Sequence, residues 1–203
     1  MRRRARHGPR GGRQTEGQAG DSRRPGRIVV PRRDLARRVR RLAREIADAY
    51  AGAEVTVLAV ANGSVIFLAD LLRHIDIPVR LGLMAVSSYP GRATESRGPV
   101  LGAPFPRDLR GRHVLIVDDI LDTGRTLAAV GAAVRRRRPR SLRTCVLLAK
   151  DRPSTGLGRP RVDFVGFRVG PEFLVGYGLD FDNLYRNLPD LRVLEGCPGP
   201  GGG

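Results

Sequence analysis

Apolar residues along this chain fall either at helical spacing or in short continuous runs. From Pro31 they recur every three or four residues, which predicts an amphipathic helix with an arginine-rich outer face that reaches Tyr50. Helices are also expected at Ser64–Arg73 and Thr126–Arg138. Short aliphatic runs typical of strands lie at Ile28–Val30, Val55–Val60, Val79–Val86, Val114–Val117 and Leu142–Ala149.

The order of these segments predicts the fold class. Strands alternate with helices along most of the chain, which is typical of an α/β fold with a doubly wound, mostly parallel sheet. The part from Asp163 through Val175 has shorter apolar runs separated by turns, and we expect it to form a small lobe over the sheet. The polar stretch from Ser87 to about Leu101 predicts a long loop, and loops of that length often act as active-site lids.

Composition supports one domain with two tails. The chain has 203 residues, 41% of them hydrophobic, which is enough for one compact core. Residues 1–27 contain nine arginines, two acidic residues and almost no large apolar side chain, so we expect a disordered basic tail. Residues 196–203 are too rich in Gly and Pro to fold, which leaves a domain at 28–195.

Several classes of protein are disfavoured. No apolar run approaches the roughly 18 to 20 residues of a membrane span, and two cysteines give neither a disulfide framework nor a metal cluster, so we expect a cytoplasmic protein without membrane contact. The net charge of +17 includes the run Arg135–Arg138. This run either binds nucleic acid or ends a helix before Pro139, where cations suit the helix dipole, and we favour the second interpretation.

The strongest chemical signal is a buried strand that ends on Asp118 and Asp119 and continues into a short turn before a helix. Ligands bind at the carboxyl ends of strands in open α/β sheets. The turn Asp122–Thr126 can direct backbone N–H groups and threonine hydroxyls at an anion, and Gly124 lets the backbone approach closely. This pattern predicts a phosphate site beside two carboxylates, which suits a sugar phosphate with bound Mg²⁺. The alternative is that Asp122 only caps the helix.

Two common phosphate motifs do not fit this segment. The GxxxxGK[ST] spacing of a P-loop and the GxGxxG of a dinucleotide site are both absent from it. The segment instead resembles the phosphoribosyl-pyrophosphate-binding motif of type I phosphoribosyltransferases, and the chain from about Ile28 to Glu195 is similar to the hypoxanthine(-guanine) phosphoribosyltransferases. Further segments resemble, in order, the pyrophosphate loop (Asn62–Ser64) and its helix (Phe67–Arg73), the mobile loop (Ser87, Ser88, Tyr89), the purine-contacting lysine segment (Leu147–Lys150) and the hood (Asp163–Phe167 with Val175–Asp180).

The resemblance implies roles on the phosphoribosyl side of the site. Asp118 and Asp119 would face the ribose hydroxyls directly or through Mg²⁺ and so be the metal-binding residues. The residues that would bind the 5′-phosphate are Asp122, Thr123, Gly124, Arg125 and Thr126. Pyrophosphate would be met by Asn62, Gly63 and Arg186.

On the purine side, the resemblance makes Asp122 the candidate general base near N7. Lys150, the only lysine among 37 basic residues, would donate to the 6-oxo group. Phe164 would stack on the purine, and the Val165 backbone would meet its Watson–Crick edge. Taken alone, Phe164 could equally be a core residue, and Arg186 a solvated surface arginine.

The sequence departs from the family pattern at two places. Asn62 stands where a basic residue is usual, and Pro171 stands where a second metal-contacting aspartate is expected, with Glu172 next to it. We therefore expect weaker contacts to pyrophosphate and to a second metal ion. The ribose-phosphate and purine contacts are expected to be intact.

The function implied is purine salvage. Phosphoribosyl would pass from phosphoribosyl pyrophosphate to hypoxanthine or guanine, and the enzyme would be a homo-oligomer, either a dimer or a tetramer. The alternative, from another class, is a regulator on the same fold that senses the sugar pyrophosphate and binds nucleic acid through its basic segments. Asp122, Lys150 and Phe164 favour the enzyme, since a sensor needs the phosphate site but neither a base nor a purine clamp.

Overall fold

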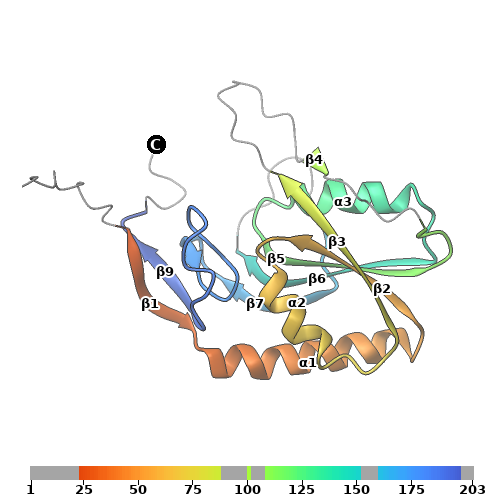
Figure 1. The fold of residues 1–203 in the computed structure, drawn as a ribbon, viewed down its shortest axis with the longest axis horizontal. Coiled ribbons are helices and arrows are strands. Elements are labelled where there is room, and N and C mark those ends of the chain that lie inside the picture. The colour runs from red at the N-terminus through yellow and green to blue at the C-terminus, as the bar shows by residue number, and fades with distance from the viewer. Residues whose placement is uncertain (1–22, 88–99, 102–107, 152–159, 198–203) are drawn as a thin grey trace, which may run out of the picture.

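The computed structural model describes residues 23–87, 100–101, 108–151 and 160–197, which form an α/β fold (Figure 1). Its main sheet has six strands in the order β4-β3-β2-β5-β6-β7. All neighbouring pairs from β3 to β7 are parallel, and only β4 runs antiparallel at the edge. The strands are β2 (Val55–Ala61), β3 (Val79–Ser87), β4 (Val100–Leu101), β5 (His113–Leu121), β6 (Ser141–Lys150) and β7 (Phe164–Val169). The predicted fold class is confirmed.

Helices cover both faces of this sheet, and each face has its own core. On one face α1 (Arg32–Tyr50) and α2 (Val65–Leu72) pack with residues such as Val57 and Leu115. On the other face α3 (Arg125–Arg135) packs with residues such as Leu58 and Ile116. Because β2 and β5 are buried on both faces, their sequences are nearly continuous apolar runs.

A second, smaller sheet lies beside the main one and joins the two ends of the described chain (Figure 1). Its strands are β1 (Arg24–Val30), β9 (Leu191–Glu195) and β8 (Leu174–Val175), in the antiparallel order β1-β9-β8. We call this sheet, together with residues 176–190, the lobe. The structure corrects the domain boundary expected at residue 27, because pairing with β9 extends the first strand back to Arg24.

The structure also corrects the expected composition of the lobe. The segment from Asp163 to Phe167 was assigned to it, but β7 pairs in parallel with β6 and is the outer strand of the main sheet. The helix expected at Thr126–Arg138 is α3, which ends three residues earlier, at Arg135, and Arg136–Arg138 are exposed ahead of Pro139. Most of the expected loop from Ser87 to Leu101, and the tails 1–22 and 198–203, lie outside the described residues. No helix in the described part of the chain is long and apolar enough to cross a lipid bilayer.

Candidate active site

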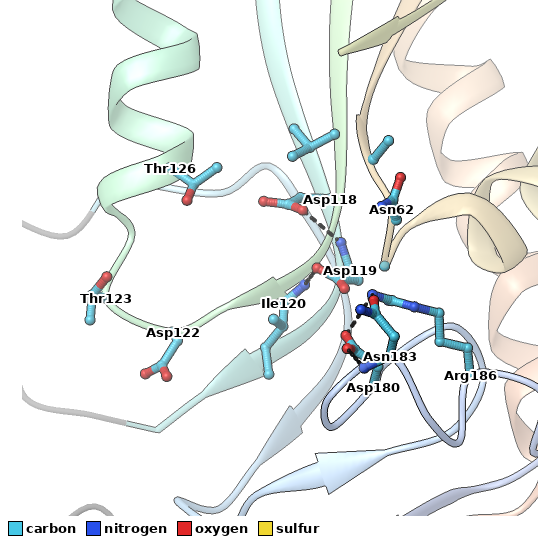
Figure 2. A pocket seen from close by; sticks show the side chains of 13 residues that line it. Asn62, Asp118, Asp119, Ile120, Asp122, Thr123, Thr126, Asp180, Asn183 and Arg186 are labelled. Atoms are coloured by element: carbon cyan, nitrogen blue, oxygen red, sulfur yellow. Dashed lines mark hydrogen bonds and ion pairs between the residues drawn. The ribbon is translucent and has the colours of Figure 1, made fainter. Parts of the chain in front are cut away.

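A cavity of about 740 Å³ opens at the carboxyl ends of β2 and β5 (Figure 2). Three segments line it: residues 60–63 at the end of β2, residues of β5 and the turn to α3, and residues of the lobe. The polar residues among them are Asn62, Asp118, Asp119, Asp122, Thr123, Thr126, Asp180, Asn183 and Arg186. This cavity lies at the edge of the sheet where the sequence analysis expects a ligand.

Two adjacent carboxylates form the floor of this cavity. Asp118 is only 5% exposed, and its Oδ1 accepts a hydrogen bond of 3.0 Å from the backbone N–H of Asp119. The Oδ1 of Asp119 accepts one of 2.8 Å from the N–H of Ile120. Burial and the neighbouring charge of Asp119 raise the pKa of Asp118, and burial also raises the pKa of Asp119. A cation in the cavity would relieve this repulsion.

The turn to α3 carries the residues that the sequence analysis expects to bind phosphate. Asp122, Thr123 and Thr126 line the cavity, and Gly124 has a φ of 80°, in the left-handed region that glycine adopts without strain. The N–H of Arg125 approaches Thr123 Oγ1 at 3.4 Å, and Arg125 begins α3. The Thr123 hydroxyl thus lies at the N-terminus of α3, and Thr126 lines the same cavity, an arrangement that suits an anion.

Asn62 and Gly63 face the acid pair from the end of β2, where a cis peptide bond joins Ala61 to Asn62. A Cβ atom on Gly63 would lie 1.6 Å from Asp119 Oδ2. Only glycine at position 63 therefore leaves room for the Asp119 carboxylate. Ser64 Oγ donates to the carbonyl of Val60 and ties the loop back to its own strand.

The lobe completes the cavity with residues that the sequence analysis partly missed. Arg186 lines it as expected, and its guanidinium donates to the Gly178 carbonyl at 2.7 Å and pairs with Asp180 at 2.8 Å. Asp180 and Asn183 were not predicted as site residues, although Asp180 ends the segment that was likened to the hood. Glu172 instead pairs with Arg27 at 2.6 Å and does not line the cavity. The additional carboxylate of the site is therefore that of Asp180.

Lys150 ends β6, next to this cavity. It is 6% exposed, and its Nζ lies 3.5 Å from Asp122 Oδ2. The structure thus brings together the two residues that were expected to handle the purine, a proton acceptor and an ammonium donor. Ser87 ends β3, while Ser88 and Tyr89 lie outside the described residues.

The structure does not bring Phe164 and Val165 to the site, and this corrects their expected purine contacts. Phe164 begins β7 at the amino end of the strand, pairs with Cys145 and is buried in the core. The carbonyl of Val165 accepts a hydrogen bond of 2.6 Å from Arg38. Both therefore lie away from the carboxyl edge. Among the phenylalanines of the described residues, Phe173 is the exposed one, at 38%, and it lies beside Phe181 in the lobe.

A parallel sheet with an acid pair and a glycine-containing turn at its carboxyl edge is typical of proteins that bind a phosphorylated ligand. Residues 30–182 match the phosphoribosyl transferase domain. The hypoxanthine phosphoribosyltransferase of Salmonella typhimurium is 37% identical over 164 residues, which cover 80% of this chain and 91% of that protein. The hypoxanthine-guanine phosphoribosyltransferase of Aquifex aeolicus is 40% identical over 172 residues, which cover 83% and 94%.

Solved structures agree with these sequence matches. A hypoxanthine-guanine phosphoribosyltransferase from Bacillus anthracis superposes with a TM-score of 0.77 at 32% identity, covering 84% of this chain and 99% of that one. The Trypanosoma cruzi hypoxanthine phosphoribosyltransferase complexed with IMP gives 0.74 at 34% identity, covering 85% and 91%. This chain belongs to the phosphoribosyltransferase family.

The contact between Gly63 and Asp119 gives a first prediction. In Gly63→Ala the new methyl group displaces the Asp119 carboxylate, and misplacing a catalytic group by about 1 Å can cost 10²-fold in rate. We expect phosphoribosyl transfer to fall by about 10²-fold in kcat/KM, with little loss of stability because only the end of a side chain must move. The control is Gly131→Ala in α3, where a Cβ meets Arg135 at an ordinary 3.5 Å. Full activity of Gly63→Ala would show that Asp119 is not needed in its present place.

Proposed function

We propose that this chain transfers the phosphoribosyl group of phosphoribosyl pyrophosphate to N9 of hypoxanthine or guanine. The bond from C1′ to the pyrophosphate oxygen breaks, the bond from C1′ to N9 forms, and the purine gives up a proton. The observation that carries the proposal is the meeting, in one cavity, of the acid pair with the turn Asp122–Thr126, beside Lys150. The names of the relatives are those of enzymes with this activity.

Mg²⁺ fits the residues of the cavity. The raised pKa of Asp118 reflects two carboxylates held side by side with little water, and a divalent cation would balance their charge. No group of three ligating side chains converges in the described part of the chain. That suits Mg²⁺, which usually takes one or two carboxylates and completes its shell with water and substrate oxygens. When bound, it would neutralise charge on the departing pyrophosphate.

We assign the protein's own chemistry to the turn before α3, the loop after β2, the lobe and β6. Thr123 and Thr126 would hold the 5′-phosphate, and Asn62, Gly63 and Arg186 would meet the pyrophosphate. Asp122 would accept the purine proton near N7, and Lys150 would donate to the 6-oxo group. Support for these roles is the 3.5 Å separation of Lys150 Nζ and Asp122 Oδ2.

The regulator alternative gains no support from the comparisons. A sensor of phosphoribosyl pyrophosphate needs the acid pair and the phosphate turn, but it has no use for a buried ammonium beside a carboxylate at the edge of the cavity. Burying Lys150 costs free energy, which a purely structural site would avoid with an apolar residue.

Cys145 and Cys197 are both free thiols, which fits our proposal of a cytoplasmic enzyme.

We also propose that the protein is a homo-oligomer, with β3 in the contact surface. Leu81 and Leu83 lie on one face of this strand and are 53% and 51% exposed. Adjacent exposed leucines are typical of a surface that another protein covers. We expect light scattering to give a multiple of the 22.2 kDa chain mass, and Leu81→Lys with Leu83→Lys to reduce it. A monomer mass for the unchanged protein would contradict this.

The test of the proposed function is release of pyrophosphate from phosphoribosyl pyrophosphate with each purine base in turn. An ammonium has three donors and no acceptor, so Lys150 suits the oxo group at position 6 and leaves the amino group of adenine unpaired. We expect hypoxanthine and guanine to react and adenine to be slower by up to about 10⁴-fold in kcat/KM. Excess chelator should abolish the reaction, and full activity without Mg²⁺ would contradict the metal assignment.

Lys150→Gln should erode this discrimination, because the amide presents either a donor or an acceptor. Arg168→Gln is the matched control, since it removes a positive charge from the exposed surface of the neighbouring strand β7. Comparable kcat/KM values for adenine and hypoxanthine in the unchanged protein would contradict both the role of Lys150 and the proposed substrate class.

Asp122→Asn tests the general base. The amide has nearly the shape of the carboxylate but cannot accept the proton, so we expect kcat to fall by about 10²- to 10⁴-fold while binding of phosphoribosyl pyrophosphate is retained. Asp151→Asn, an exposed carboxylate next to Lys150 in the chain, serves as the control. A kcat near that of the unchanged protein would reject the role of Asp122.

A further inference from the structure

The lobe meets the loop after β2 through a tight turn centred on Tyr177. Gly176, Tyr177 and Gly178 have φ values of 97°, 49° and 103°, so three successive residues lie in the left-handed region. Their backbone is held within the lobe, because the N–H groups of Tyr177 and Gly178 donate to the carbonyls of Leu188 and Arg186 at 2.8 and 3.0 Å. The turn therefore presents the Tyr177 ring away from the lobe in a fixed direction.

That ring reaches across to α2. It is 7% exposed, and its hydroxyl donates a hydrogen bond of 2.7 Å to Asp70 Oδ2. Burial and the nearby Asp70 carboxylate raise the pKa of Tyr177, so the hydroxyl keeps its proton and remains a donor throughout the physiological pH range. A side-chain bond thus connects residues 107 positions apart, one in the lobe and one in the helix that follows Asn62 and Gly63.

The backbones are in close contact at the same place. A Cβ on Gly178 would lie 2.2 Å from the carbonyl oxygen of Gly63 and 3.7 Å from Ile66. Gly178 is in turn bonded through its carbonyl to Arg186, which pairs with Asp180. Tyr177 precedes Gly178 in the chain, and Asp70 lies in α2, the helix that follows Gly63. The hydrogen bond between Tyr177 and Asp70 therefore joins the same two segments that touch at Gly178 and Gly63.

The cavity has one wall formed by Asn62 and Gly63 and another formed by the lobe residues Asp180, Asn183 and Arg186. These two walls belong to one side of the cavity. Figure 2 shows Asn62, Asp180, Asn183 and Arg186 on the side opposite Asp122, Thr123 and Thr126. In the function proposed above, that side meets the pyrophosphate, while Asp122 and Lys150 meet the purine. A change in the spacing of the two walls should therefore act on one substrate more than on the other.

We propose that the hydrogen bond between Tyr177 and Asp70 sets the spacing of the two pyrophosphate-facing walls and so determines the affinity for phosphoribosyl pyrophosphate. Both are positioning residues, because neither lines the cavity. They act through Gly63 and Arg186, whose places they fix. This inference rests on the proposed function for the identity of the substrate.

The experiment is titration calorimetry of phosphoribosyl pyrophosphate with Mg²⁺ and without purine, alongside steady-state kinetics. Tyr177→Phe removes one hydroxyl and leaves the ring in place, and the loss of a hydrogen bond to a carboxylate corresponds to about a tenfold change in an equilibrium constant. We expect the Kd and the KM for phosphoribosyl pyrophosphate to rise about tenfold. The KM for hypoxanthine and kcat should change less than about twofold.

Changes at Asp70 give an independent line of evidence. Asp70→Asn keeps an oxygen that can accept from Tyr177 and should bind nearly as well as the unchanged protein, whereas Asp70→Ala should weaken binding as much as Tyr177→Phe does. The double variant of Tyr177→Phe and Asp70→Ala should be no weaker than either single variant, since both remove the same interaction. Asp70 also pairs with the exposed Arg73 at 3.6 Å, and Arg73→Gln, which removes only that pair, should leave the affinity unchanged.

Tyr50→Phe is the control for stability. Tyr50 is 5% exposed, and its hydroxyl donates at 3.2 Å to the carbonyl of Val114, near the amino end of β5 and far from the cavity. Like Tyr177→Phe, it removes a buried hydrogen bond and should lower the melting temperature, but it should not weaken binding. Unchanged affinity in Tyr177→Phe and Asp70→Ala, or equal weakening in Tyr50→Phe, would overturn the inference. A protein that binds phosphoribosyl pyrophosphate but transfers to no purine would instead contradict the proposed function, and the Kd series would still test the hydrogen bond.

Discussion

Burial of two adjacent carboxylates, Asp118 and Asp119, is the costly feature around which the site is built. Their pKa values are raised because little water reaches them, and the protein offsets the cost only in part, with N–H donors from Asp119 and Ile120. Two buried carboxylates stay side by side only when the surrounding structure holds them there. The strand that carries the pair, β5, pairs with β2 as far as Val117 and with β6 through Leu121, which fixes the backbone from which both side chains extend.

Neighbouring segments are shaped to leave room for these carboxylates. Gly63 has no side chain where Asp119 Oδ2 lies, and Arg186 brings a positive charge that favours the ionised form of Asp119. Arg186 is itself held by Asp180 and the Gly178 carbonyl. Charge balance within the cavity therefore depends on the lobe, which the chain builds by pairing its first described strand, β1, with its last, β9.

The division of labour across the cavity follows from this architecture. The main sheet supplies the acid pair, the phosphate turn and Lys150, all at the ends of strands fixed by parallel pairing. The lobe supplies Asp180, Asn183 and Arg186, and it touches the main domain closely at Gly178 and through Tyr177. A few contacts between the lobe and the main domain can thus adjust the affinity for phosphoribosyl pyrophosphate without changing the affinity for the purine base.

The sequence by itself determined the elements and the chemistry that are local. The continuous apolar run of β5, the acids at its end and the glycine turn before α3 lie within a dozen residues, so their arrangement follows from strand and helix geometry. It did not determine which sheet a short apolar segment joins. Residues 163–167 and 173–175 have similar patterns, yet one is the outer strand of the main sheet with Phe164 in its core, and the other belongs to the lobe with Phe173 exposed. Asp180 reaches the cavity, and β1 extends back to Arg24, for the same reason: each depends on pairing with residues far away in the chain, and only the tertiary structure specifies those partners.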